Sequence, residues 1–135
     1  MEDILEVYQR PYDPRFPVLC VDERPYQLVQ GLAQELPMKA GRVAKQDYQY
    51  ERRGTCCVLA AVEPRGGRRQ VEVRRHRGKR EYASFMRRLA ARYPEAERII
   101  LIQDNLNTHG PGAFYEFFPA KEARALAKRF ELHFT

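Results

Sequence analysis

The chain has 135 residues, of which 44% are hydrophobic and 31% charged, and its formal net charge is +6. This length suits one domain with a buried core and is too short for two. The composition excludes wholesale disorder. The acidic residues 1–6 lack the basic and apolar stretches of a signal peptide, and no apolar run reaches the roughly 20 residues that cross a membrane. We therefore expect a cytoplasmic protein with no membrane contact.

The three cysteines, Cys20, Cys56 and Cys57, lie in apolar runs and show no Cys-x-x-Cys spacing. An odd number of cysteines without ligand spacing favours reduced, buried thiols over a disulfide framework or a zinc site.

The chain begins with an expected lead-in segment, residues 1–17. Its three prolines, Pro11, Pro14 and Pro17, prevent a continuous helix and favour extended neighbours. The first strand is expected at about residues 18–22. A long loop over residues 31–45 and an extended piece over 46–51 then follow.

The middle of the chain predicts a hairpin and then a helix. Strands over residues 55–62 and 68–73 flank a turn that contains Gly66 and Gly67, which is typical of a β-hairpin. From Lys79 to about Arg92 the apolar spacing becomes helical. The residues that mark this helical face are Tyr82, Phe85, Met86 and Leu89.

The last third predicts a fourth strand over residues 98–103 and a loop over 105–112. A second helical region follows, with Pro119 at its first position and a face marked by Ala123, Leu126, Ala127 and Phe130. A fifth strand is expected at the last few residues. The order strand, strand, strand, helix, strand, helix, strand predicts an α/β fold, in which flanking helices cover a mixed sheet.

Two aspartates stand where apolar runs stop. Residues 18–21 lead into Asp22, and residues 99–103 lead into Asp104. Short apolar runs indicate buried strands, and ligands of open α/β sheets bind at the carboxyl ends of strands. Two carboxylates meeting there would hold a hard divalent cation suited to phosphoryl transfer. Aspartate also commonly begins a turn after a strand, and that reading stays open for each residue alone.

Residues 65–80 contain eight basic side chains and one acid, Glu72. The basic residues are Arg65, Arg68, Arg69, Arg74, Arg75, Arg77, Lys79 and Arg80. Such a cluster predicts a phosphate-binding surface. A solvated hairpin and helix start would explain it equally well, because arginine is mostly exposed in any protein.

The motifs resemble those of DDE transposases, and most closely the bacterial insertion-sequence transposases of the mariner-related superfamily, six-thirty group. The matching segments are residues 18–23, 47–55, 100–109, 111–119 and 131–135. The resemblance implies a ribonuclease H-like fold, in which the first and fourth strands are neighbours. It also implies that residues 18–135 form the catalytic domain, incomplete at its carboxyl end.

By this resemblance, Asp22 and Asp104 correspond to the first two catalytic, metal-binding carboxylates, with Mg²⁺ or Mn²⁺ as cofactor. The third, a glutamate, would follow Thr135, so we expect the isolated chain to be inactive. The implied function is DNA transposition, by phosphodiester cleavage and strand transfer at insertion-sequence ends. The implied partners are DNA and a second copy in a homodimer, and the implied location is the bacterial nucleoid.

Four polar residues beside the aspartates are candidates for supporting roles. Glu23 follows Asp22 directly and in an extended chain points away from it, which favours a structural role over direct metal ligation. Asn105, Asn107 and His109 lie in the loop after Asp104, where they could orient water or contact DNA phosphate. His109 could instead brace its own loop.

Two other functions stay open. The same fold also serves nucleases and Holliday-junction resolvases, although the string from Asp104 to His109 is more similar to transposases. A non-catalytic remnant that binds nucleic acid through its arginines would also fit a chain that lacks the third acid.

Overall fold

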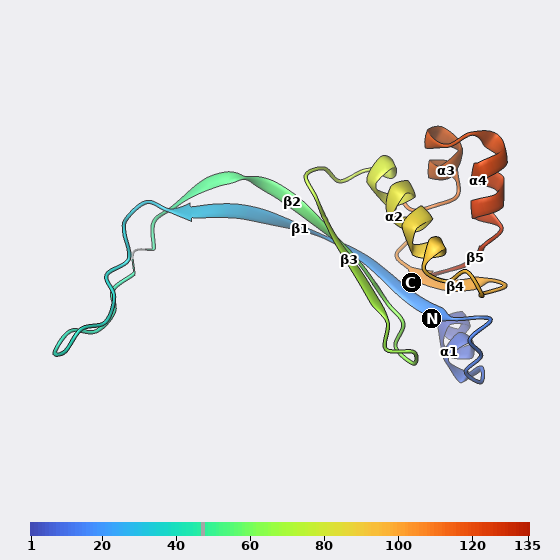
Figure 1. Ribbon diagram of the computed structural model, residues 1–135, viewed down its shortest axis with the longest axis horizontal. Coiled ribbons are helices and arrows are strands. Elements are labelled where there is room, and N and C mark those ends of the chain that lie inside the picture. The colour runs from blue at the N-terminus through green and yellow to red at the C-terminus, as the bar shows by residue number, and fades with distance from the viewer. Residues whose placement is uncertain (47) are drawn as a thin grey trace.

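The computed structural model describes residues 1–46 and 48–135. Its centre is a five-stranded sheet of order β3-β2-β1-β4-β5 (Figure 1). The strands are β1 (Val18–Gly31), β2 (Tyr50–Val62), β3 (Arg69–Arg74), β4 (Ile99–Gln103) and β5 (Phe130–Phe134). The first three pair antiparallel, whereas β4 runs parallel to both β1 and β5. The mixed sheet agrees with the predicted class, and β1 and β4 are neighbours as expected.

Helices cover both faces of the part of the sheet around β4. They are α1 (Glu2–Gln9), α2 (Lys79–Ala91), α3 (Gly112–Phe117) and α4 (Ala120–Ala127). Figure 1 shows α2, α3 and α4 on one face and α1 on the other. The predicted apolar face of α2 is buried, with Tyr82, Phe85, Met86 and Leu89 all within the main core.

Strand β4 lies between two cores, which explains why its apolar run is continuous rather than alternating. Ile99 and Leu101 belong to the main core beneath α2–α4. Ile100 and Ile102 face the other way and pack with Val7 of α1 in a smaller core. All five residues of β4 are buried.

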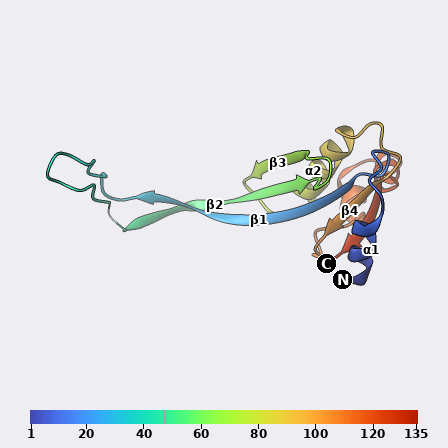
Figure 2. The same ribbon diagram turned by 90° about the horizontal axis from the view of Figure 1, so that it is seen from below.

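Strands β1 and β2 extend far beyond the predicted ranges of 18–22 and 55–62. Their outer halves form a two-stranded ribbon, hereafter the arm, with Gln27 opposite Thr55 and Gly31 opposite Tyr50. Figure 2 shows the arm reaching well beyond the helices. Ladder hydrogen bonds hold the arm together, and its side chains are mostly exposed. The sequence therefore carries no burial pattern from which the extra length could be predicted.

At the tip of the arm, the expected loop over residues 31–45 contains two isolated antiparallel bridges, Leu36 with Lys45 and Lys39 with Arg42. The extended piece predicted over residues 46–51 falls in part on Asp47, which lies outside the described residues. Its last two residues, Tyr50 and Glu51, belong to β2.

Residues 2–9 of the lead-in segment form α1, a helix that the sequence did not predict. The helix ends at Gln9, so all three prolines follow it. The single helical region predicted after residue 112 is instead two helices. Pro119 has ψ of 144°, which is not helical, and it precedes α4 rather than beginning it. Phe130, assigned to the helical face, opens β5 instead.

The three cysteines are all free, and Cys57 is buried while Cys20 and Cys56 are half-buried. Burial, followed by the negative charge of Glu23, raises the pKa of Cys57 to about 11, so this thiol stays protonated at neutral pH. Among the described residues, no helix is long and apolar enough to cross a lipid bilayer.

A chain of charged contacts ties α1 to β5. His133 contacts Asp3 through Nδ1 at 2.6 Å and Glu131 through Nε2 at 2.9 Å, and Arg10 donates to Glu131 at 3.2 Å. Burial lowers the pKa of His133, but the hydrogen bonds with the two carboxylates raise it more, so the net shift is upward. The hydrogen bond with His133 lowers the pKa of Glu131, despite the opposing effect of burial.

These shifts predict that α1 is held most firmly between about pH 4.5 and 6.5, the ordinary values for glutamate and histidine. The contribution of His133 is complete below its unfolded pKa and is lost as pH rises through the raised folded value. The contribution of Glu131 is complete above its unfolded pKa and is lost as pH falls through the lowered folded value. Losing one charged hydrogen bond of about 1.5 kcal/mol corresponds to roughly tenfold in the opening equilibrium.

Native-state hydrogen exchange of α1 amides at pH 5.5 and 8.5, corrected for intrinsic rates, measures this difference. The amides of α2 provide the internal reference, and His133→Gln should remove the upper part of the pH dependence. Equal α1 protection at both pH values would contradict the tie.

Candidate functional site

The parallel pairing of β1 with β4 brings the two aspartates together along the sheet. Its last aligned pair is Cys20 with Ile102, and continuing that register by two residues puts Asp22 level with Asp104. The Asp22 residue is exposed, and the side chain of Asp104 is 41% exposed. Both carboxylates are therefore open to solvent, near the point where β4 ends and β1 continues into the arm.

His109 lies between two carboxylates that come from different strands. Its Nδ1 is 2.7 Å from Asp104 Oδ1, and its Nε2 is 3.1 Å from Glu23 Oε2. In a hydrogen bond between an imidazole N–H and a carboxylate, the ring nitrogen donates and the carboxylate oxygen accepts. The imidazole thus connects the loop after β4 to β1 across the pairing of the two strands.

The ring of His109 is closed off from solvent, with a side-chain exposure of 0%. It stacks on Tyr82, with ring centroids 4.7 Å apart and planes at 20°. The hydroxyl of Tyr82 in turn donates to Gln103 Oε1 at 2.8 Å, and burial raises the pKa of Tyr82. This enclosure favours the bracing role for His109 over a direct contact with DNA phosphate.

Sequence reasoning missed Tyr82 and Gln103 as supports of this loop. Gln103 ends an otherwise apolar strand and is itself buried. A polar residue in such a run signals a side chain that needs hydrogen-bond partners. The two asparagines of the loop, Asn105 and Asn107, are exposed, so they remain accessible to a ligand.

Glu23 is buried, with a side-chain exposure of 1%, and forms an ion pair with Arg77 through Oε1. It points into the interior while Asp22 is exposed, in accord with the predicted structural role. The partners of Glu23 lie 54 and 86 residues away along the chain, so no local sequence pattern indicates them.

The eight basic residues of the 65–80 segment do not form one uniform surface, because β3 separates them into two groups. Most have partners within the chain: Arg65 with the backbone oxygens of Tyr8 and Arg10, Arg68 with the Tyr93 ring, Arg74 with Glu72, Arg77 with Glu23, and Lys79 with Glu116. Arg69, Arg75 and Arg80 are exposed and have no side-chain partner among the described residues. These three guanidinium groups are the ones most available to phosphate.

The donor set fits a hard divalent ion in one respect. Asp22 and Asp104 present carboxylate oxygens, the ligands that Mg²⁺ prefers, and Mg²⁺ usually keeps several waters. Within the described part of the chain, no group of three or more His, Cys, Asp or Glu residues is placed to hold a metal. A bound ion would therefore depend on the two aspartates, water and substrate oxygens.

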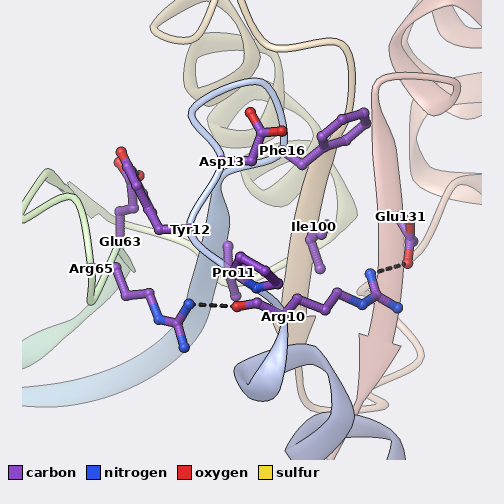
Figure 3. A pocket seen from close by; sticks show the side chains of 10 residues that line it. Arg10, Pro11, Tyr12, Asp13, Phe16, Glu63, Arg65, Ile100 and Glu131 are labelled. Carbon is purple, nitrogen blue, oxygen red and sulfur yellow. Dashed lines mark hydrogen bonds and ion pairs between the residues drawn. The ribbon is translucent and has the colours of Figure 1, made fainter.

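A separate hollow of about 500 Å³ lies at the other end of the paired strands (Figure 3). Tyr12, Glu63 and Arg65 line it, together with Val18 and Ile100, the first aligned pair of β1 and β4. Four residues of strand, or roughly 13 Å, separate that pair from the level of the aspartates. The hollow is therefore not part of the candidate site.

Solved structures of the Mos1 transposase have a similar fold. The Mos1 strand transfer complex matches with a TM-score of 0.56 and 17% identity, over 97% of this chain and 38% of that chain. A pre-cleavage Mos1 transpososome gives 0.52 and 16%, over 97% and 39%. The Mos1 mariner paired end complex with Mn gives 0.51 and 18%, with the same coverage.

The present chain thus spans less than two fifths of the length of these Mos1 chains. The matches confirm the predicted ribonuclease H-like fold. No curated protein sequence matches the chain.

The family model described as DDE superfamily endonuclease matches residues 17–135. This segment contains both aspartates, Glu23, His109 and all five strands. The chain therefore belongs to the DDE superfamily endonuclease family.

Proposed function

We propose that residues 18–135 are the catalytic domain of a DNA transposase, with residues 1–17 as a lead-in segment packed against it. The observation that carries this proposal is the alignment of Asp22 with Asp104 on neighbouring strands, in a chain of the DDE family. The motif strings around both aspartates support an insertion-sequence element of the bacterial six-thirty group. The corresponding location is the cytoplasm, at the nucleoid.

In this proposal Asp22 and Asp104 share a divalent ion, Mg²⁺ or Mn²⁺. When bound, such ions neutralise phosphate charge and activate the attacking oxygen. The aspartates would hold this ion beside the DNA phosphodiester, and the exposed Asn105 and Asn107 lie in the adjoining loop, where they can contact the sugar–phosphate backbone. The reaction is cleavage at the element ends, followed by strand transfer.

The DNA partner would be held mainly by charge. The exposed Arg75 and Arg80 flank Arg77, which touches Glu23 of the site. Phosphate contacts of this kind fix the position of the duplex without reading its sequence. We therefore propose that Arg75 and Arg80 hold the DNA backbone near the aspartates.

A homodimer is part of the same proposal. The arm and its tip expose many large apolar side chains, and exposed apolar patches mark interaction surfaces. They are Tyr26, Leu28, Val29, Leu32, Leu36, Met38, Val43, Tyr48 and Tyr50. A second copy of the chain would cover this surface.

The metal prediction is tested with Mn²⁺, whose unpaired electrons broaden nearby amide signals in nuclear magnetic resonance spectra. We expect weak binding that broadens signals around Asp22 and Asp104. Asp22→Asn should weaken it by roughly tenfold or more, since even groups that only support a metal ligand contribute 10–100-fold. Asp13→Asn, the same charge change at a site paired with Arg15, is the control. Equal Mn²⁺ affinities of the wild type and Asp22→Asn would contradict a shared cation site.

The DNA prediction is tested by the salt dependence of binding. Each phosphate contact contributes about 0.9 to the slope of log affinity against log salt on duplex DNA. Replacing both Arg75 and Arg80 with alanine should flatten the slope by at most about 1.8 and weaken all sequences alike. Arg124→Ala with Lys128→Ala removes the same charge from exposed positions at the end of α4 and should leave the slope unchanged. Equal slopes for both double variants would show that Arg75 and Arg80 are solvated in the complex and do not contact DNA phosphate.

The same DNA samples test the proposed inactivity of residues 1–135 alone. Two carboxylates leave the site without the third acid that the resemblance requires, and catalytic geometry tolerates little substitution. No strand cleavage is expected in Mn²⁺. Cleavage that disappears in Asp104→Asn would show that another acid of this chain completes the site.

A further inference from the structure

The buried histidine beside the aspartates has no role in the proposed reaction as stated so far. His109 bridges Asp104 and Glu23 at 2.7 and 3.1 Å, and it is the only one of the three residues without a carboxylate. Because the ring is fully enclosed, it cannot reach DNA or a cation in solution. Its position is instead suited to acting on Asp104.

We propose that His109 and Glu23 are positioning residues that hold Asp104 in the orientation needed to bind a divalent cation. The inference rests on the proposed function, because it assigns a role at the same site. It concerns how the aspartate is held, and neither His109 nor Glu23 contacts the cation.

The side chain of Asp104 is partly exposed and needs support from other residues to stay in one orientation. Its side chain is 41% exposed and lies just beyond the end of β4, so neither the strand nor close packing fixes its rotamer. The contact of Oδ1 with His109 Nδ1 restrains the carboxylate, and Oδ2 has no partner among the described residues. A carboxylate held in this way loses less conformational freedom when it binds a cation.

His109 is itself held rigidly by its neighbours. Its ring is fixed on one side by stacking on Tyr82 and at Nε2 by Glu23. Its backbone N–H donates to the Leu106 oxygen at 2.9 Å, which closes the loop after Asp104. The ring is therefore held by α2 and β1, and through its contact with Asp104 it holds the aspartate in a fixed position relative to both elements.

The buried carboxylate of Glu23 has partners on two sides. A buried carboxylate is unfavourable unless it is paired, and here Arg77 and His109 are both within reach. Glu23 is thus compensated from the basic segment on one side and from the loop on the other. Supporting hydrogen bonds of this kind around metal ligands are worth 10–100-fold in metal affinity.

Two substitutions of His109 separate the contacts of its two ring nitrogens. The amide nitrogen of asparagine lies close to the place of Nδ1, and that of glutamine lies close to the place of Nε2. His109→Asn therefore keeps a donor facing Asp104, whereas His109→Gln keeps one facing Glu23. The two variants differ by one methylene group and have the same charge.

The test is Mn²⁺ titration of the full chain, followed by broadening of amide signals. We expect His109→Ala and His109→Gln to lower the affinity by about tenfold or more, and His109→Asn to keep most of it. Glu23→Ala, which frees the other ring nitrogen, should weaken binding less than His109→Ala does, because the contact with Asp104 remains. Thermal unfolding and amide spectra establish that each variant is folded at the titration temperature.

Glu63→Gln is the control for a general loss of stability. Glu63 is also buried and accepts hydrogen bonds from Tyr93 at 3.1 Å and Tyr12 at 3.4 Å, but it lies away from the aspartates. This substitution should lower the unfolding temperature without changing the Mn²⁺ affinity.

Wild-type affinity in His109→Ala would overturn the inference, and so would equal losses in His109→Asn and His109→Gln. The outcome for Asp22→Asn separates this failure from that of the proposed function. If Asp22→Asn loses affinity while His109→Ala keeps it, the cation site stands and only the positioning role fails. If Asp22→Asn keeps affinity, the site itself fails.

Discussion

The parallel pairing of β1 with β4 is the constraint on which the rest of the molecule depends. It joins an antiparallel unit, β1 to β3, to a helix-covered parallel unit, β4 and β5. Only three residue pairs define the contact, from Val18 with Ile100 to Cys20 with Ile102. Because a shift of one residue turns every side chain to the opposite face, the two cores on either side of β4 fix this register. The same register sets the relative positions of Asp22 and Asp104.

The interactions around Glu23 extend this constraint past the last paired residues. The residue pairing between β1 and β4 stops at Cys20. Three positions further along β1, the side chain of Glu23 contacts His109 in the loop that follows β4. The side-chain bridge is enclosed by Tyr82 of α2, so the helix that covers the sheet also supports the candidate site. The site is thereby held by packed elements rather than by its loop alone.

The sequence was sufficient for the parts of the fold that bury apolar side chains. The face of α2 around Tyr82 and Leu89 and the continuous run of β4 both follow from burial, and the aspartate positions followed from where those runs stop. The arm was not predictable in the same way, since its apolar residues Val29 and Tyr50 are exposed. Strand pairing places them opposite Arg52 and Gly31. Helix α1 was missed because it buries a single residue, Val7, and so shows little periodicity.

The candidate site divides along similar lines. A carboxylate after a strand is visible in a sequence, whereas the partners of Glu23 come from segments far away along the chain. The basic segment likewise looked uniform in sequence, but tertiary contacts occupy Arg65, Arg77 and Lys79 and leave Arg75 exposed. Which charges are free for a ligand depends on the fold and not on composition.

If the β1–β4 register delivers two carboxylates to one cation, an anomalous-scattering map of crystals of this chain soaked in Mn²⁺ should reveal that cation. We expect a single peak in contact with both Asp22 and Asp104, at a metal–oxygen distance of about 2.0–2.2 Å. No peak at this position, or a peak that contacts only one of the two aspartates, would contradict it.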